Sequence, residues 1–266
     1  MPTTDAVSPD DYLTEDPTNV PFGVLLKMVK SQIFFPLALI AVVAIKVVSK
    51  IKGRTDAINA VCRHSNAVEF ADMPAQARTA FEGLANQLKG FRWVRFEQRP
   101  CLGLRQQYEA LALHEDGCTI AVCEWQHHMV VVLAVEGEDP VKSSEAVTTE
   151  FLSFEGDRST IITSYLPSEH MAALVLYDGG LGDVEAVSND QRMEVAIDKH
   201  FDRLKRISPN VMNDEGACQR AEKHSDKVVK HFLDLGLIRP LLPNEVPKLQ
   251  KYREKHAAEF EPYTKV

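Results

Sequence analysis

The chain has 266 residues, a net charge of −8 at pH 7 and an isoelectric point near 5.6. This acidic balance excludes a global basic surface of the kind that binds nucleic acid, so nucleic acid is not an expected partner. The cysteines are odd in number and lack the spacing of a disulfide framework, which indicates reduced thiols and agrees with a cytoplasmic domain. They are Cys62, Cys101, Cys118, Cys123 and Cys218.

Residues 1–30 are predicted to form an acidic tail followed by an interfacial segment. Residues 1–20 contain five acidic residues, three prolines and four threonines, and they have too little apolar surface to fold alone. Residues 22–30 mix apolar and cationic side chains. They are expected either to extend the helix that follows or to lie at a membrane interface.

The most apolar stretch of the chain follows this tail. No charged residue occurs between Lys30 and Lys46, and eleven of the sixteen residues 33–48 are Leu, Ile, Val or Phe. A helix over residues 31–49 would rise about 28 Å, close to the ~30 Å hydrocarbon core of a bilayer. A buried core helix and a cleaved signal peptide are the alternatives, but the stretch shows no polar face and lies far from the start. The predicted transmembrane side chains are Ile33, Phe34, Phe35, Leu37, Leu39, Ile40, Val42, Val43 and Ile45.

Positive charges near the ends of this stretch predict its orientation. Lys27 and Lys30 precede it, whereas Lys50, Lys52 and Arg54 follow it. Because lysine and arginine accumulate on the cytoplasmic side, the C-terminal side is expected in the cytoplasm. The sequence therefore predicts a single-pass membrane protein with the bulk of its chain in the cytoplasm.

Residues 50–210 are expected to form an α+β domain on an antiparallel sheet, after a helical continuation over 50–65. Apolar residues at helical spacing predict a helix over 74–89 that ends at Gly90. The period then changes to that of strands, and short turns between strands favour antiparallel pairing. The predicted strands are 66–70, 91–98, 105–114, 118–126, 128–136, 146–155 and 159–166, with a further candidate at 172–177.

The remaining chain is predicted to be helical, with residues 211–266 as a helical extension. Ser188 and Gln191 fit a capping box for a helix over about 190–206. Asp214 is the predicted cap of a helix over 215–235, and a last amphipathic helix is expected from Asn244 to about Phe260.

No motif fixes an activity, and we predict no catalytic, cofactor-binding or metal-binding residue; the cofactor, if one exists, is unknown. The glycine-rich stretch Asp178–Asp183 lacks the pattern of a phosphate-binding loop and is interpreted as a flexible turn. His127 and His128 are placed at a turn between two strands. His224 and His231 are two helical turns apart, which is too far for one metal ion.

One region is both basic and aromatic, and it contains Arg92, Trp93 and Arg95. Arginines interleaved with aromatic residues are typical of some nucleic-acid and anionic-lipid surfaces. The alternative is a set of arginines at a sheet edge, facing solvent or neighbouring carboxylates. The predicted lipid or partner contacts are Lys50, Lys52, Arg54, Arg92, Trp93 and Arg95.

Three functions are compatible with these features. The first is a non-catalytic accessory or scaffold subunit of a larger membrane complex, with membrane lipid and other subunits as partners. The second is a membrane-tethered ligand- or lipid-binding sensor, with a groove between sheet and helices lined by Trp93, Trp125 or Tyr108. The third is an enzyme that uses isolated carboxylates or His127 and His128, which requires two titratable groups to converge.

Overall fold

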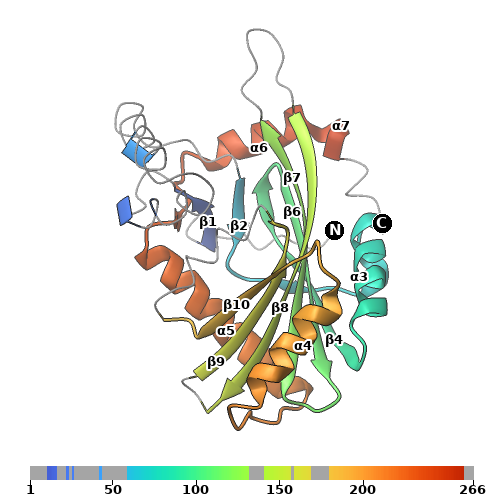
Figure 1. The fold of residues 1–266 in the computed structure, drawn as a ribbon. Helices are drawn as coiled ribbons and strands as arrows, with labels where there is room; N and C mark the ends of the chain where they lie inside the picture. Colours follow the sequence, from blue (N-terminus) through green and yellow to red (C-terminus); the bar gives the residue numbers. More distant parts are fainter. Residues whose placement is uncertain are drawn as a thin grey trace.

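The structure, a computed structural model, describes residues 11–16, 22–23, 26, 42–43, 59–131, 141–156, 159–168 and 180–260. In this part of the chain a large seven-stranded sheet has helices on both faces, and a four-stranded sheet lies beside it (Figure 1). The predicted α+β class is confirmed.

The large sheet has the strand order β10-β9-β8-β7-β6-β4-β3. Its strands are β3 (Asn66–Ala67), β4 (Phe91–Arg99), β6 (Arg105–His114), β7 (Thr119–Val131), β8 (Val141–Glu155), β9 (Ser159–Leu166) and β10 (Asp183–Ser188). Neighbouring strands from β3 to β9 are antiparallel, as the short turns predict. A short 3₁₀ helix, η2 (Phe70–Asp72), follows β3.

The prediction of a purely antiparallel sheet is wrong at one edge, because β10 pairs with β9 in parallel. The glycine-rich stretch before it was expected to be only a flexible turn. Gly182, with φ +148°, lies so close to β9 that a Cβ atom there would overlap the Thr160 carbonyl oxygen. The glycine therefore permits the close approach that starts β10.

The predicted turn at His127 and His128 is also wrong. Strand β7 runs without interruption from Thr119 to Val131, and His127 lies opposite Gln106 of β6. Its side chain is fully buried and stacks on Trp125. Because the pairing continues through both histidines, the two expected strands are one.

The two faces of the large sheet contact different helices, because side chains alternate along each strand. One face packs against α3 (Ala75–Gln87) and α4 (Met193–Leu204), and the other packs against α5 (Asp214–Asp234). Buried residues of the first face include Ala110, Ala112, Cys123, Trp125 and Phe151. Buried residues of the second face include Leu111, Leu113, Ile120, Leu152 and Ile162.

These helices were predicted, but their caps differ from the prediction. Helix α4 begins after Arg192, and the Ser188 hydroxyl donates a hydrogen bond to Asp190 and not to the helix. Helix α5 is capped by Asn213, whose side-chain oxygen accepts a 2.8 Å hydrogen bond from the Gly216 N–H. Asp214, the predicted cap, is instead the first residue of the helix.

The smaller sheet joins the beginning and the end of the described chain. Its antiparallel order is β11 (Ile238–Pro240), β1 (Tyr12–Glu15), β2 (Asn59–Cys62) and β5 (Cys101–Gly103). Helix α6 (Val246–Lys255) contacts β5, and α7 (Ala257–Phe260) follows it. Two predictions are wrong here: the tail contains β1, and β2 interrupts the helix expected over 50–65. The expected helical extension also contributes a strand, β11.

A buried ion triad fixes this sheet to α6. Arg239 donates two hydrogen bonds to the Glu245 carboxylate, at 2.7 and 2.5 Å, and its Nε lies 3.3 Å from Asp16 Oδ2. All three side chains are buried, with 6% or less of their surface exposed. Asp16 follows β1 and Arg239 lies on β11, so the triad connects segments from opposite ends of the sequence.

The prediction of a membrane span over residues 31–49 is corrected by the structure. No helix in the described ranges is long and apolar enough to cross a membrane, and the span itself lies outside them except for Val42 and Val43. We therefore withdraw the predicted single-pass topology and membrane location.

Replacing Arg239 with Met should destabilise the protein by about 3–5 kcal/mol, because it leaves two buried carboxylates without their cation. Chemical denaturation measures this loss. The matched control is Lys205→Met, which removes an exposed ion pair with Asp202 and should change stability by less than about 1 kcal/mol. Similar losses in the two variants would show that the triad is not a structural support.

Candidate functional site

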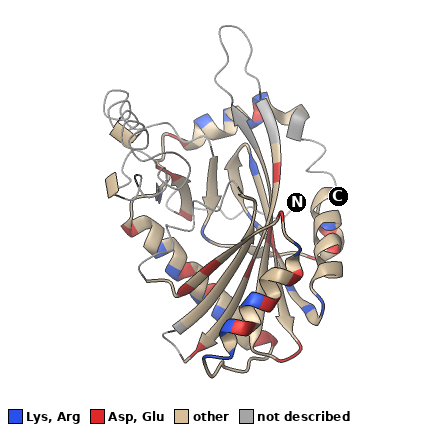
Figure 2. Cartoon of the chain, viewed as in Figure 1, with Lys and Arg blue, Asp and Glu red and all other residues tan. Residues whose placement is uncertain are grey.

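Arg92 and Arg95 bind helix α5. Arg92 Nη1 donates a 2.9 Å hydrogen bond to Asp214 Oδ2, and Arg95 Nη1 donates a 2.8 Å hydrogen bond to Glu222 Oε1. Figure 2 shows acidic and basic residues mixed along α5. The arginines of β4 thus face carboxylates of the protein itself, which was the alternative interpretation of this basic region.

The other predicted contact residues lie elsewhere. Trp93 points to the α3 side of the sheet, where its ring packs against Phe81 and Phe96 at centroid distances of 6.1 and 5.5 Å. It is therefore part of the core between α3 and the sheet. Lys50, Lys52 and Arg54 lie outside the described residues.

Three glutamates lie side by side on the α5 face of the large sheet. Glu97 of β4 is directly opposite Glu109 of β6, and Glu109 is directly opposite Glu124 of β7. We call these three residues the glutamate row. Like charges at directly opposite positions destabilise a sheet, so the row requires compensating charges.

Arginines supply this compensation at two of the three positions. Arg99 Nε and Nη2 lie 2.8 and 3.0 Å from the two oxygens of Glu109. Arg95 Nε lies 3.0 Å from Glu97 Oε1. Burial and the acidic partners act in opposite directions on both arginines, and the net effect raises the pKa of each.

Glu124 is compensated less well than its neighbours. The closest cationic atom recorded for it, Arg105 Nη2, is 3.7 Å from Glu124 Oε1 and instead donates a 2.7 Å hydrogen bond to Gln126. Burial raises the pKa of Glu124 to about 7; Arg105 opposes this rise and Glu109 adds to it. Its side chain is 27% exposed, so solvent reaches it. Glu124 can therefore bind or release a proton near neutral pH.

A fourth glutamate and a histidine adjoin the row. Glu150 of β8 accepts a 3.2 Å hydrogen bond from the Ser164 hydroxyl and lies 3.9 Å from His224 Nε2 of α5. His224 is 5% exposed, and neither ring nitrogen has a hydrogen-bond partner in the described structure. Burial, together with Lys227, lowers the pKa of His224 to about 4, so the ring is neutral at physiological pH.

We call this whole region the charged half of the α5 face. It contains Arg95, Glu97, Arg99, Arg105, Gln107, Glu109, Glu124, Gln126 and Glu150 of the sheet, with Glu222 and His224 of α5.

Sequence reasoning missed the row because its members are far apart in the chain and belong to no motif. One feature of the sequence could have revealed part of the row. The turn around Asp116 and Gly117 joins β6 to β7 and sets which of their residues lie opposite each other. Extending that register along the two strands places Glu109 opposite Glu124. The register of β4 could not be extended in this way, because a bulge between Trp93 and Arg95 shifts it.

A buried polar network elsewhere resembles catalytic groups but is structural. His200 Nε2 lies 3.0 Å from Ser153 Oγ, and its Nδ1 lies 3.0 Å from Thr163 Oγ1. Ser153 and His200 are completely buried. Burial, with help from Arg203, lowers the pKa of His200 to about 3. No substrate reaches this pair, which instead anchors α4 to the sheet.

His127 and His128, the histidines considered for an enzymatic role, do not converge. His127 and His128 point to opposite faces of β7, and burial lowers the pKa of His127 to about 4. In the described ranges, no three His, Cys, Asp or Glu residues are placed to hold a metal ion.

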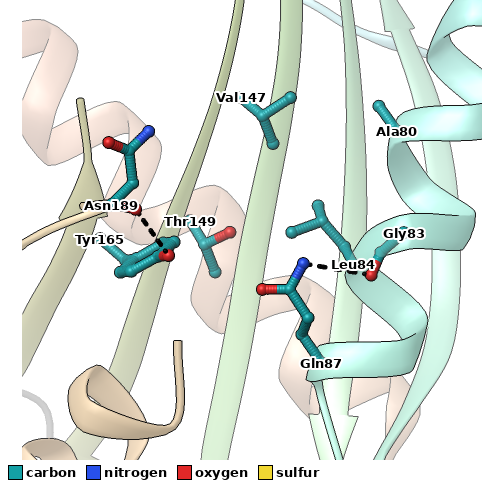
Figure 3. Close-up of a pocket in the computed structure, with 8 residues that line it drawn as sticks. All are labelled: Ala80, Gly83, Leu84, Gln87, Val147, Thr149, Tyr165 and Asn189. Atoms are coloured by element: carbon teal, nitrogen blue, oxygen red, sulfur yellow. Dashed lines mark hydrogen bonds between the residues drawn. The ribbon is translucent and has the colours of Figure 1, made fainter. Parts of the chain in front are cut away.

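A shallow groove of about 240 Å³ lies between α3 and the sheet (Figure 3). Its lining is Ala80, Gly83, Leu84, Gln87, Val147, Thr149, Tyr165 and Asn189. None of the three aromatic residues expected in a sensor groove lines it. The Tyr165 hydroxyl donates to the carbonyl oxygens of Asn189 and Gln191, at 3.3 and 2.7 Å, and so is already engaged.

Comparison with protein-family models, curated proteins and solved structures finds no significant match to the chain. The function is therefore inferred from the geometry of the site alone.

Replacing Glu124 with Gln should stabilise the protein at pH 8 by about 1–3 kcal/mol and leave it unchanged near pH 4.5. The folded protein holds the Glu124 proton up to a pKa of about 7, above the ordinary carboxyl value. The wild type therefore loses stability as the pH rises through this window, whereas the neutral amide does not. Urea denaturation at the two pH values measures the difference.

Glu109→Gln is the control for this prediction. It leaves Arg99 without its carboxylate and should destabilise the protein by about 3 kcal/mol at pH 8. Stabilisation by both substitutions, or by neither, would contradict the different roles assigned to the two glutamates.

Proposed function

We propose that this protein is a non-catalytic ligand-binding domain, a sensor whose site is the charged half of the α5 face. The observation that carries this proposal is the glutamate row, in which three carboxylates occupy directly opposite positions on β4, β6 and β7. A sheet that served only for stability would carry apolar residues there, as the same face does at Leu111 and Leu113. Charged residues at positions where a covered sheet face normally carries apolar ones are concentrated at functional sites.

Helix α5 gives the site a way to report occupancy. Arg95 contacts Glu97 of the row and Glu222 of α5, so one guanidinium connects the two elements. A ligand that changes the charge near the row changes the relative strength of the two ion pairs that Arg95 makes, one with Glu97 and one with Glu222. Arg92 and Asp214 provide a second ion pair to the same helix. Binding at the row is thereby coupled to the attachment of α5.

An enzymatic function has less support. The closest resemblance to a nucleophile and base in the described structure, Ser153 with His200, is completely buried. The accessory or scaffold role predicted from the sequence stays a prediction, without its membrane component.

A thermal-shift screen tests the proposal with three sets of small molecules: amines and guanidines, carboxylates and phosphates, and uncharged sugars and alcohols. A ligand present at 100 times its Kd stabilises by about 2.7 kcal/mol, which raises the Tm of a chain of this size by roughly 5–10 °C. At least one compound should shift the wild type and fail to shift Glu124→Gln.

Glu82→Gln is the matched control, because Glu82 is exposed on α3, away from the charged half. It should respond like the wild type. The absence of any shift across all three sets, or equal shifts in Glu124→Gln, would overturn the proposed function.

A further inference from the structure

The guanidinium groups of the site are not shared evenly among its carboxylates. The charged half contains five carboxylates, Glu97, Glu109, Glu124, Glu150 and Glu222, and three guanidinium groups, Arg95, Arg99 and Arg105. Two further cations are close to this region: Lys227, which acts on His224, and Arg253, which donates a hydrogen bond to the Arg105 carbonyl oxygen. His224 adds no positive charge at neutral pH because its ring is neutral there.

Glu124 is the member of the glutamate row with the weakest compensation. Glu109 is engaged through both oxygens by Arg99, and it also accepts a 3.0 Å hydrogen bond from Gln107 Nε2. Arg105, the nearest cation to Glu124, donates its short hydrogen bond to Gln126. A positively charged partner is thus electrostatically favoured at Glu124 more than at the other positions of the row.

Buried polar atoms without partners adjoin the same place. Gln107 is 5% exposed, and its Oε1 accepts no hydrogen bond in the described structure. The ring nitrogens of His224, equally buried, also have no hydrogen-bond partner there. Leaving a buried acceptor unsatisfied costs about 1–3 kcal/mol, so native proteins rarely do so without another reason.

Gln107 and Glu124 lie on neighbouring strands, two residues apart in the pairing register, on the same face. Diagonal neighbours of this kind are about 7–8 Å apart or somewhat less, a distance that one small molecule can bridge. A positively charged partner with more than one N–H donor satisfies both residues. A metal ion can also bind amide and carboxylate oxygens, but the described residues contain no group of three His, Cys, Asp or Glu placed to hold one.

We propose that the ligand of this site is an organic cation, an ammonium or guanidinium compound that pairs with Glu124 and donates a second hydrogen bond to Gln107 Oε1. This inference rests on the proposed function and specifies the chemical class of the ligand. His224 closes the site from α5, as a neutral group that does not repel the cation.

The charged groups that act on Glu124 come from β4, β6 and β8. They are Arg99, Arg105, Glu109 and Glu150. Helix α5, which packs against this face, adds Glu222 and His224. Among those whose pKa shift is resolved, Glu124 is the one with a value near neutrality, about 7, so its proton competes with the ligand. Binding of the cation should release this proton.

Titration calorimetry of the full chain with agmatine and with 1,4-diaminobutane tests the inference. Affinity should rise about tenfold between pH 6 and pH 8, as expected when a group of pKa near 7 must lose its proton. Heats measured in buffers of different ionisation enthalpy should show proton release. Glu124→Gln should weaken binding at least tenfold, Gln107→Leu should weaken it by a smaller factor, and Glu82→Gln should leave it unchanged.

The outcomes separate this inference from the function on which it rests. Binding of an anionic or uncharged compound that is lost in Glu124→Gln, without binding of either amine, would overturn the ligand class and leave the proposed function standing. Equal binding of potassium or magnesium at matched ionic strength would also overturn it, in favour of an inorganic cation. No binding by any compound would overturn both.

Discussion

Helix α5 packs against the large sheet through small side chains, with Ala217, Cys218 and Ala221 near strand residues such as Leu111 and Leu152. Small residues let the helix approach the sheet closely at one end. Larger and charged residues follow farther along, at Glu222 and His224. The sheet under α5 is consequently apolar around Leu111 and Leu152 and ionic around Glu109 and Glu124, and the position of the candidate site depends on this division.

The ionic end is organised by the pleat of the sheet. Because every second residue of a strand points to the same side, Glu97, Glu109 and Glu124 share a face while their chain neighbours belong to the opposite one. Phe96, Ala110 and Cys123 pack in the core against α3. The same short segments therefore contribute to a dry core on one side and to a charged surface on the other.

Elements that depend on local periodicity could be predicted from the sequence. The apolar spacing of Ala77, Phe81 and Leu84 predicted α3, and β6 and β9 were predicted to the residue. Elements that depend on distant partners could not. Strand β1 pairs with β2 and β11, and β10 pairs with β9, and all of these partners except β9 for β10 are far away in the sequence. The span predicted over residues 31–49 rested on hydrophobicity alone, and hydrophobicity does not distinguish a lipid environment from a protein interior. The glutamate row requires three strands in register, information that no window of sequence contains.

The smaller sheet imposes an order on folding. Leu13 pairs with Pro240, and Asp16 meets Arg239, so segments from opposite ends of the described chain must come together to complete it. During synthesis, β1 emerges from the ribosome long before β11 exists. The strands β4 to β9, by contrast, are joined to their neighbours by short connections and can assemble as they emerge. The four-stranded sheet is consequently a late structure, and β1 has an unpaired edge until β11 has emerged.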